Sequence, residues 1–269
     1  MTSALLVYPW IYDFAAYDLW LKPLGFLYIA SILRNMGIKV TFIDCLDRYH
    51  ERLSFSFRKS FYHKNYGCGK YYYEEVEKPQ LLKKFPRRYK RYGLPLQVFL
   101  DEIGKLSIPD IILASSGMTY WYPGVFEAIK ILKVKFPRVP IILGGAYATL
   151  CYQHALRGSG ADYVFKGENL ARLIELIEET TGADFSGKEL PLGFSSYPYP
   201  AYDLYRKNEY VAIRTSVGCP FRCSYCAVSL LSGKFEQREP ELVAREIEYF
   251  HRNLGVKNFV FYDDSLLFN

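Results

Sequence analysis

Three closely spaced cysteines are the feature of this sequence that could most directly do chemistry. Cys219, Cys223 and Cys226 follow the pattern Cys-x3-Cys-x2-Cys, directly after a predicted strand. Three thiolates on one short loop can each bind one corner iron of a 4Fe-4S cubane, whereas a bacterial ferredoxin run supplies a fourth cysteine that is missing here. The fourth iron would be open to the amino and carboxylate groups of a methionine moiety. The spacing therefore predicts a 4Fe-4S cluster with one iron free for a ligand.

A zinc site is the main alternative for these thiols, and it would need a fourth ligand. His251 lies on a later predicted helix and Cys151 in an earlier part of the chain, so neither is supplied by the loop itself. The six cysteines are also unlike the dispersed set of a secreted disulfide framework. We therefore favour cofactor ligation.

The cysteine motif resembles that of the radical S-adenosylmethionine (SAM) superfamily. The resemblance implies a reduced cluster that cleaves bound SAM to a 5'-deoxyadenosyl radical, so that the cofactor carries the difficult chemistry. Tyr225 matches the superfamily's aromatic position, where the residue lies against the adenine. Asp263 and Asp264 end a later strand, where members commonly place groups that contact the SAM amino end. An Asp pair at a strand end is also ordinary turn chemistry.

Alternating strand-like and helix-like segments must position this loop. The alternation predicts an α/β fold with a doubly wound, five-stranded parallel sheet of the Rossmann or flavodoxin type. Helices are expected near residues 24–35, 96–103 and 170–180, and from Pro123 onward, since proline suits a first helical turn. The expected strands are residues 4–8, 39–44, 110–114, 140–143 and 162–165.

Two domains and a linker are expected. Residues 1–182 would form the sheet domain, and residues 183–208, rich in Gly, Ser and Pro, the linker. Residues 209–269 would supply the first βα units of a radical SAM partial (β/α) barrel, with strands at 211–215 and 258–262 and a helix at 240–253. A barrel βα unit takes roughly 30 residues. We therefore expect a truncated piece of a longer enzyme, inactive by itself.

The first domain resembles the cobalamin-binding domain that precedes many radical SAM barrels. In an open parallel sheet, ligands bind beyond the carboxyl ends of the strands. By resemblance, Ser115, Ser116 and Thr119 would lie near the cobalamin nucleotide tail. The residues that would line the tail are Gly144, Gly145 and Thr149. The other segments that carry the resemblance are Pro23-Leu24-Gly25, Asp44 and Lys166-Gly167-Glu168.

A histidine motif found in some cobalamin domains is missing. These domains place a histidine on cobalt with Asp-x-His-x-x-Gly, but the loop after the first strand contains no histidine. The resemblance then implies that cobalamin binds without a histidine ligand. A degenerate domain that has lost the cofactor is the alternative.

The net charge of +6 is concentrated in one segment. Residues 48–93 hold thirteen Lys/Arg against four Asp/Glu, and eight tyrosines lie among them. Such a segment could stack bases and neutralise phosphates. We favour an ordered insertion that packs over the sheet and keeps its charges in water, because charge runs are usually solvated surface.

The N-terminus lacks a secretion signal, and the longest apolar runs are strand-sized, so we expect a cytoplasmic protein without a membrane segment.

The resemblance favours a cobalamin-dependent methyltransferase that acts at a poorly activated carbon or phosphorus. Radical cyclisation, rearrangement or another modification without methyl transfer is the first alternative, and a zinc or nucleic-acid binding module the second. The implied partners are a small-molecule or natural-product-like substrate and an external electron donor of the flavodoxin or ferredoxin type.

Overall fold

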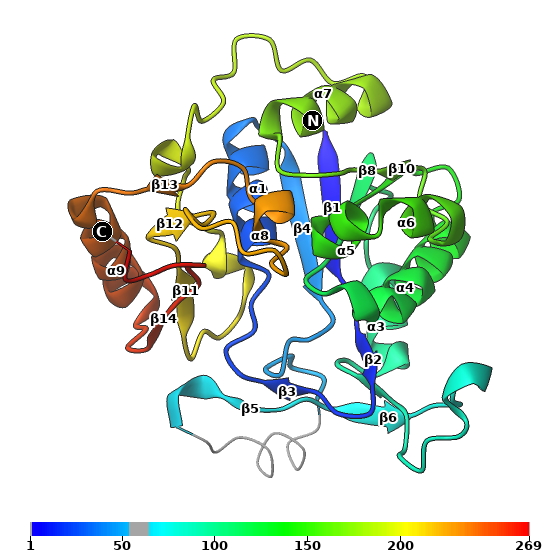
Figure 1. Cartoon of the computed structure of the whole chain (residues 1–269). Coiled ribbons are helices and arrows are strands. Elements are labelled where there is room, and N and C mark those ends of the chain that lie inside the picture. Colours follow the sequence, from blue (N-terminus) through cyan, green and yellow to red (C-terminus); the bar gives the residue numbers. More distant parts are fainter. Residues whose placement is uncertain (1, 54–64, 269) are drawn as a thin grey trace.

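A five-stranded parallel sheet forms the centre of the N-terminal part of the chain in the computed structural model, which describes residues 2–53 and 65–268 (Figure 1). The strand order is β10-β9-β8-β1-β4, so the sheet grows outward from β1 in both directions. All four neighbouring pairs are parallel. The predicted α/β class and the doubly wound sheet are confirmed. The strands are β1 (Ser3–Tyr8), β4 (Lys39–Asp44), β8 (Ile111–Ser116), β9 (Ile141–Gly144) and β10 (Tyr163–Val164).

Helices cover both faces of this sheet because side chains alternate along each strand. In β1, Ala4, Leu6 and Tyr8 pack into one core, which includes residues of α1 and α7. Leu5 and Val7 pack into a second core, which includes residues of α3, α4, α5 and α6. Within the part of the chain that the structure describes, no helix is long and apolar enough to cross a membrane. The helices are α1 (Leu24–Asn35), α3 (Leu96–Gly104), α4 (Tyr122–Lys135), α5 (Gly145–Leu150), α6 (Tyr152–Gly158) and α7 (Leu170–Thr181).

The basic segment at residues 48–93 folds, in its described part, through short antiparallel pairings. Strand β7 pairs with β2 and β6, and β5 pairs with β3. The guanidinium of Arg91 is buried and pairs with Glu74 and with Glu127 of α4. Part of the positive charge is therefore internal and neutralised. The strands are β2 (Ile11–Asp13), β3 (Tyr17–Asp18), β5 (Gly69–Lys70), β6 (Tyr73–Glu75) and β7 (Lys90–Tyr92).

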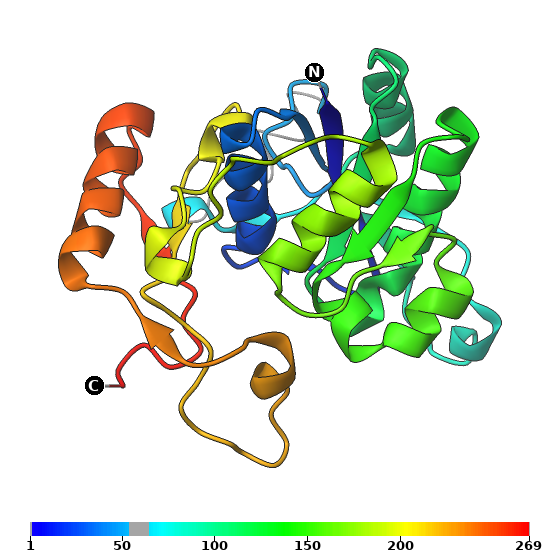
Figure 2. The same cartoon turned by 90° about the horizontal axis from the view of Figure 1, so that it is seen from above.

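The segment at residues 183–208, expected as a linker, packs closely against its neighbours. Its aromatic side chains Phe194, Tyr202 and Tyr205 are buried in a third core. That core also contains Leu27 of α1 and Phe250 of α9 (Pro240–Leu254). Figure 2 shows the segment between these two helices. Two short 3-10 helices, Phe194–Ser196 and Tyr202–Leu204, are the regular structure within it.

A second, smaller group of strands follows this segment. Strand β11 (Val211–Ile213) pairs in parallel with β14 (Phe259–Phe261), and α9 lies between them in sequence, as a βαβ unit requires. An antiparallel pair, β12 (Ser216–Val217) with β13 (Glu236–Gln237), begins soon after β11. The chain between β12 and β13 carries the three clustered cysteines and the short helix α8 (Val228–Leu231).

A buried carboxyl group joins the two parts of the chain at the end of β4. The hydroxyl of Tyr205 donates to Asp44 Oδ2 at 2.5 Å, and the amide of Leu46 donates to Oδ1 at 2.8 Å. Burial raises the pKa of Asp44 from 3.8 to about 6, against the opposing effects of the nearby Lys22 ammonium and the Tyr205 hydrogen bond. The protonated form is therefore favoured in the folded chain near pH 5.

This raised pKa predicts a distinctive pH dependence of stability. The folded state holds the proton of Asp44 up to about pH 6. The contribution of Asp44 to the free energy of unfolding is therefore fully present below pH 3.8 and is lost as the pH rises through about 6. The loss amounts to ~3 kcal/mol of unfolding free energy. We expect Asp44→Asn to flatten the decline between pH 4 and 6, measured by urea unfolding of the cofactor-free chain. Asp203→Asn, at an exposed ion pair with Arg34, is the control and should leave the decline in place. An unchanged decline in Asp44→Asn would contradict the assignment.

Candidate functional site

The cysteine loop connects β12 to β13, close to the carboxyl end of β11. Gly218 begins the loop with φ +74, in the left-handed region that favours glycine. A Cβ at this position would lie 3.3 Å from the carbonyl oxygen of Lys234 on the returning chain. The two strands of chain that begin and end the loop therefore lie close together at Gly218 and Lys234.

The three cysteines of the loop are all free thiols that face solvent to different extents. Cys219 is half-buried, whereas Cys223 and Cys226 are exposed. The amide of Cys226 donates to the carbonyl of Cys223 at 3.0 Å, which places these two residues on one turn. Among the described residues, no three His, Cys, Asp or Glu side chains converge tightly enough to hold a metal ion. The donor set suits a cubane chemically, and the loop would have to draw its thiols together around it.

Neither His251 nor Cys151, the two residues considered as a fourth zinc ligand, lies on the cysteine loop. His251 Nδ1 lies 2.8 Å from the carbonyl oxygen of Val256 at the end of its own helix. Cys151 lies at the junction of α5 and α6 in the sheet domain.

Tyr225 is 90% exposed and stands clear of the protein surface. This leaves its ring free to lie against a ligand, as the predicted adenine contact requires. Phe221 on the same loop packs edge-on against Phe268, with 5.6 Å between ring centroids. This contact ties the tip of the loop to the chain that follows β14.

The two predicted aspartates have different surroundings. The carboxylate of Asp263 accepts hydrogen bonds from the backbone and hydroxyl groups of Thr215 and Ser216. Asp264 is exposed and accepts none of these bonds. Partial burial of its carboxyl raises the pKa of Asp264, while the Arg214 guanidinium lowers it and Asp263 raises it further.

Two charged groups near Asp264 were not among the predicted site residues. Arg214 follows β11, and its Nε donates to the carbonyl of Tyr262 at 3.3 Å. Burial raises the pKa of Glu168, in the loop after β10, while the Arg214 guanidinium and the Gly233 amide lower it. The loop after β10 in the sheet domain thus comes close to the carboxyl ends of β11 and β14. Glu168 lies in the Lys-Gly-Glu segment at a predicted strand end, but no sequence pattern pairs it with Arg214.

The hydroxyl groups predicted to lie near a cobalamin tail belong to the last two residues of β8 and to Thr119, just after it. Ser115 is half-buried at the end of the strand, and Thr119 is half-buried at the start of a 3-10 helix. Ser116 is only 3% exposed, and its hydroxyl donates to the carbonyl of Met118 at 3.0 Å. Ser115 and Thr119 are therefore better placed than Ser116 to contact a ligand.

The residues predicted to line the tail lie at the end of β9, beside those of β8. Gly144 pairs with Ser115, and Gly145 with Ser116. Thr149 is buried, and its hydroxyl bridges the carbonyl of Gly145 and the amide of Gly167. The structure thus brings the six predicted residues to or next to neighbouring strand ends, with the Thr149 hydroxyl joining α5 to the loop after β10.

Gly145 allows β8 and α5 to approach closely. It has φ +87, and a Cβ there would lie 2.5 Å from Ser115 Oγ and 2.8 Å from the carbonyl oxygen of Ser116. We expect Gly145→Ala to lower the free energy of unfolding by about 2–4 kcal/mol, since strain and overlap add. Gly144→Ala is the matched control, because its φ of −125 suits any residue and no atom lies within 4 Å of the added Cβ. Equal stability of the two variants, measured by urea unfolding, would refute the packing argument.

The cysteine loop and the glycine-lined strand end meet. Helix α8, which follows Cys226, contacts α5, which begins at Gly145 (Figure 1). The predicted cluster ligands and the predicted tail-binding residues are therefore neighbours in space, although residues 150–218 separate them along the chain.

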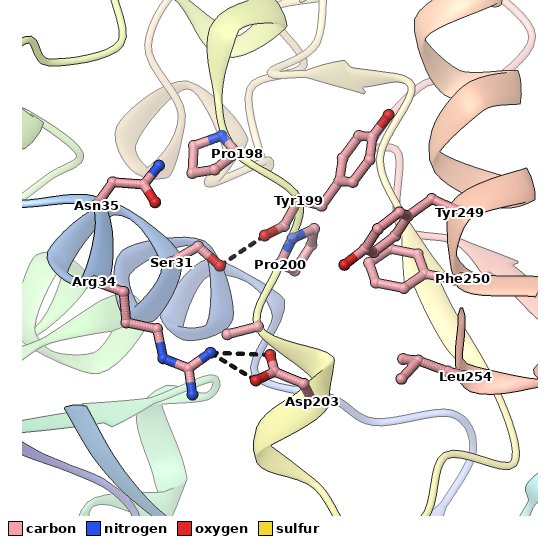
Figure 3. Close-up of a pocket in the computed structure, with 11 residues that line it drawn as sticks. Ser31, Arg34, Asn35, Pro198, Tyr199, Pro200, Asp203, Tyr249, Phe250 and Leu254 are labelled. Atoms are coloured by element: carbon pink, nitrogen blue, oxygen red, sulfur yellow. Dashed lines mark hydrogen bonds and ion pairs between the residues drawn. The ribbon is translucent and has the colours of Figure 1, made fainter. Parts of the chain in front are cut away.

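A separate open pocket of about 390 Å³ lies between α1, residues 198–203 and α9 (Figure 3). Arg34 and Asp203 form an ion pair of 2.8 Å along its wall, and the hydroxyl of Ser31 donates to the carbonyl of Tyr199 at 2.6 Å. None of the predicted site residues lines it. Three of its lining residues, Tyr199, Phe250 and Leu254, also belong to the third core or pack against it.

The segment that contains the cysteine loop is similar to a known protein family. Residues 213–268 match the radical SAM superfamily. The chain is 28% identical to an uncharacterized methyltransferase, PH0819, of Pyrococcus horikoshii over 66% of this chain and 45% of that protein. It is 26% identical to the anaerobic magnesium-protoporphyrin IX monomethyl ester cyclase of Synechocystis over 58% of this chain and 36% of the cyclase. The chain thus spans less than half the length of these relatives.

A solved structure shares the overall fold. The radical SAM methyltransferase TsrM from Kitasatospora setae, solved with tryptophan substrate and the SAM analogue aza-SAM, superposes with a TM-score of 0.59. The superposition covers 99% of this chain and 48% of TsrM, at 16% sequence identity. The likeness therefore extends over both the sheet domain and the cysteine loop.

Proposed function

Because residues 213–268 carry the sequence of a radical SAM domain, we propose that Cys219, Cys223 and Cys226 ligate a 4Fe-4S cluster in an enzyme that cleaves SAM reductively. The observation that carries this proposal is the set of three free, solvent-facing thiols on one loop at the carboxyl end of a parallel strand pair. When bound there, the cluster would supply one electron to the sulfonium of SAM.

The residues around the loop would bind and orient SAM. The exposed ring of Tyr225 can lie against the adenine, because no protein group covers it. The exposed carboxyl of Asp264 suits the ammonium group of the methionine moiety, and the nearby Arg214 suits its carboxylate. Partial burial raises the pKa of Asp264, and a bound ammonium group would lower it.

We further propose that the sheet domain binds cobalamin and that the reaction is methyl transfer. The cobalamin tail would lie against Ser115, Thr119 and Gly144, whose small or hydroxyl side chains remain accessible at the strand ends. The contact between α5 and α8 supports the pairing of the two cofactors, because it brings their predicted sites together. Bound cobalamin would supply a transferable methyl group. The printed name of PH0819, a methyltransferase, agrees with this assignment.

Radical cyclisation without methyl transfer is the second candidate, since a relative is named as a cyclase. The proposed substrate of either reaction is a small molecule, and the proposed reductant is an external flavodoxin or ferredoxin.

Product analysis separates these functions. In the whole enzyme, anaerobically reconstituted and reduced with dithionite, SAM is expected to give 5'-deoxyadenosine, and the Cys223→Ala variant of that enzyme is not expected to release it. With SAM carrying a deuterated methyl group, methyl transfer places the label in the substrate product, whereas cyclisation leaves the product unlabelled. Deoxyadenosine release that is unaffected by Cys223→Ala would refute the radical SAM proposal.

A further inference from the structure

The carboxylate of Asp263 accepts several hydrogen bonds from Thr215 and Ser216, where the chain leads from β11 toward the cysteine loop. Asp263 Oδ1 accepts from the amide and hydroxyl of Thr215 at 3.0 and 2.8 Å, from the hydroxyl of Ser216 at 2.7 Å and from the Ser216 amide. Oδ2 lies 3.3 Å from the Thr215 amide. A carboxylate offers roughly four lone-pair sites for its acceptor bonds. The donors of Thr215 and Ser216 therefore fill the accepting capacity of Oδ1 and hold the carboxylate in one orientation.

The backbone carbonyls of Arg214 and Thr215 accept hydrogen bonds from Arg238, which precedes α9. The amide of Arg238 donates to the carbonyl of Thr215 at 2.8 Å, and its guanidinium donates to the carbonyl of Arg214 at 3.0 Å. That guanidinium is in turn held by Glu246 of α9, with both side chains almost fully buried. Residues 214–216, which lead from β11 into the first residue of β12, are thus fixed by the chain after β14 on one side and by Arg238 and α9 on the other.

We propose that Asp263 is a positioning residue that clamps the base of the cysteine loop, and that it leaves the ligand-binding role of the aspartate pair to Asp264. This inference rests on the proposed cluster-binding function of the loop. Through Thr215 and Ser216, Asp263 sets where Gly218 and Cys219 begin relative to β14. Because Oδ1 accepts all four donors, an ammonium group that bound Oδ1 would have to displace some of them. Asp264 has no such commitment to Thr215 or Ser216.

Hydrogen exchange of the cofactor-free chain tests the clamp without any cluster. We expect Asp263→Asn to speed amide exchange at Thr215 and Ser216 by at least about tenfold, because the charged acceptor that protects both amides is lost. Asp264→Asn makes the same change in charge one residue away and is expected to leave both rates as in the parent. Unchanged exchange in Asp263→Asn would overturn the proposal. The test stays valid if no cluster forms, so its failure is distinct from failure of the proposed function.

Cluster retention tests the consequence for the loop. Reconstituted protein is exposed to a chelator, and the loss of iron absorbance is followed over time. We expect Asp263→Asn to lose iron at least about tenfold faster than the parent, and the double variant Thr215→Val, Ser216→Ala to show part of this increase, because it removes the two hydroxyl donors but keeps the carboxylate. Adding Asp263→Asn to the double variant should then raise the rate of iron loss by a smaller factor than it does in the parent.

The double variant keeps the proposal open to refutation if Asp263→Asn does not fold. Parent-like iron loss from the double variant, or full additivity in the combined variant, would overturn the clamp. Weakened SAM binding in Asp263→Asn with parent-like iron loss and amide exchange would instead make Asp263 a SAM ligand.

Discussion

Replacing Cys223 with alanine is expected to lower the iron content of the reconstituted chain from about four atoms to below about one. A cubane held by three thiolates has no spare protein ligand, so losing one leaves two irons without protein coordination. The same loss is expected for Cys219→Ala and Cys226→Ala. Iron and acid-labile sulfide are measured per chain after anaerobic reconstitution and desalting.

Cys151→Ala is the matched control for these variants. Cys151 is also a partly accessible free thiol, but it lies between α5 and α6 rather than on the loop. We expect this variant to load iron as the parent does. Equal iron loading in Cys151→Ala and Cys223→Ala, whether both high or both low, would separate iron binding from the loop and refute the assignment.

Introducing phenylalanine at Gly144 is expected to reduce the retention of hydroxocobalamin from about one per chain to below about 0.1, since a bulky group in a closely fitted site excludes the ligand. Gly144 lies at the end of β9 beside Ser115, and no protein atom lies within 4 Å of the position of a Cβ. The new ring would therefore project into the space assigned to the cobalamin tail without disturbing the sheet. Retention is measured by absorbance after gel filtration of the chain.

Gly104→Phe controls for the general effect of an added aromatic ring. Gly104 ends α3, and its Cβ position is equally open. We expect its corrinoid retention and the thermal stability of both variants to match the parent. Parent-like retention in Gly144→Phe would move the cobalamin site elsewhere, and no retention in the parent would favour a degenerate domain.

The central sheet could be predicted from sequence because its strands are apolar, well separated and followed by amphipathic helices. Residues 39–44 were predicted as a strand and form β4 with the same limits. Short polar strands such as β3 (Tyr17–Asp18) escaped prediction, since two residues carry no periodicity and their pairing with β5 depends on chain far away in sequence.

The predicted linker shows the same limit. Its Pro and Tyr residues form no periodic pattern, and this break in periodicity predicted an interdomain linker. The structure buries Tyr202 completely, with its hydroxyl donating to the carbonyl of Ala212 and accepting from the Ala212 amide. Tertiary packing of aromatic rings, which leaves no local sequence signal, is what orders this segment.

The candidate site was predictable where its residues are contiguous. Cys219, Cys223 and Cys226 define a loop by spacing alone, and no long-range contact is needed to identify them. Asp263 and Asp264 are chemically identical in sequence, and only their different hydrogen-bond partners distinguish them. The approach of Glu168 to Arg214 likewise depends on how the two parts of the chain pack, which no local pattern encodes.

Mössbauer spectroscopy of the chain reconstituted anaerobically with 57Fe tests the central claim most directly, because it reports the type of centre and the number of distinct irons together. We expect the spectrum of a 4Fe-4S cluster in which one iron of about four changes its parameters when SAM is added, since three cysteines leave one iron open. A chain that binds a single zinc and no inorganic sulfide, or a cluster whose irons all ignore SAM, would contradict it.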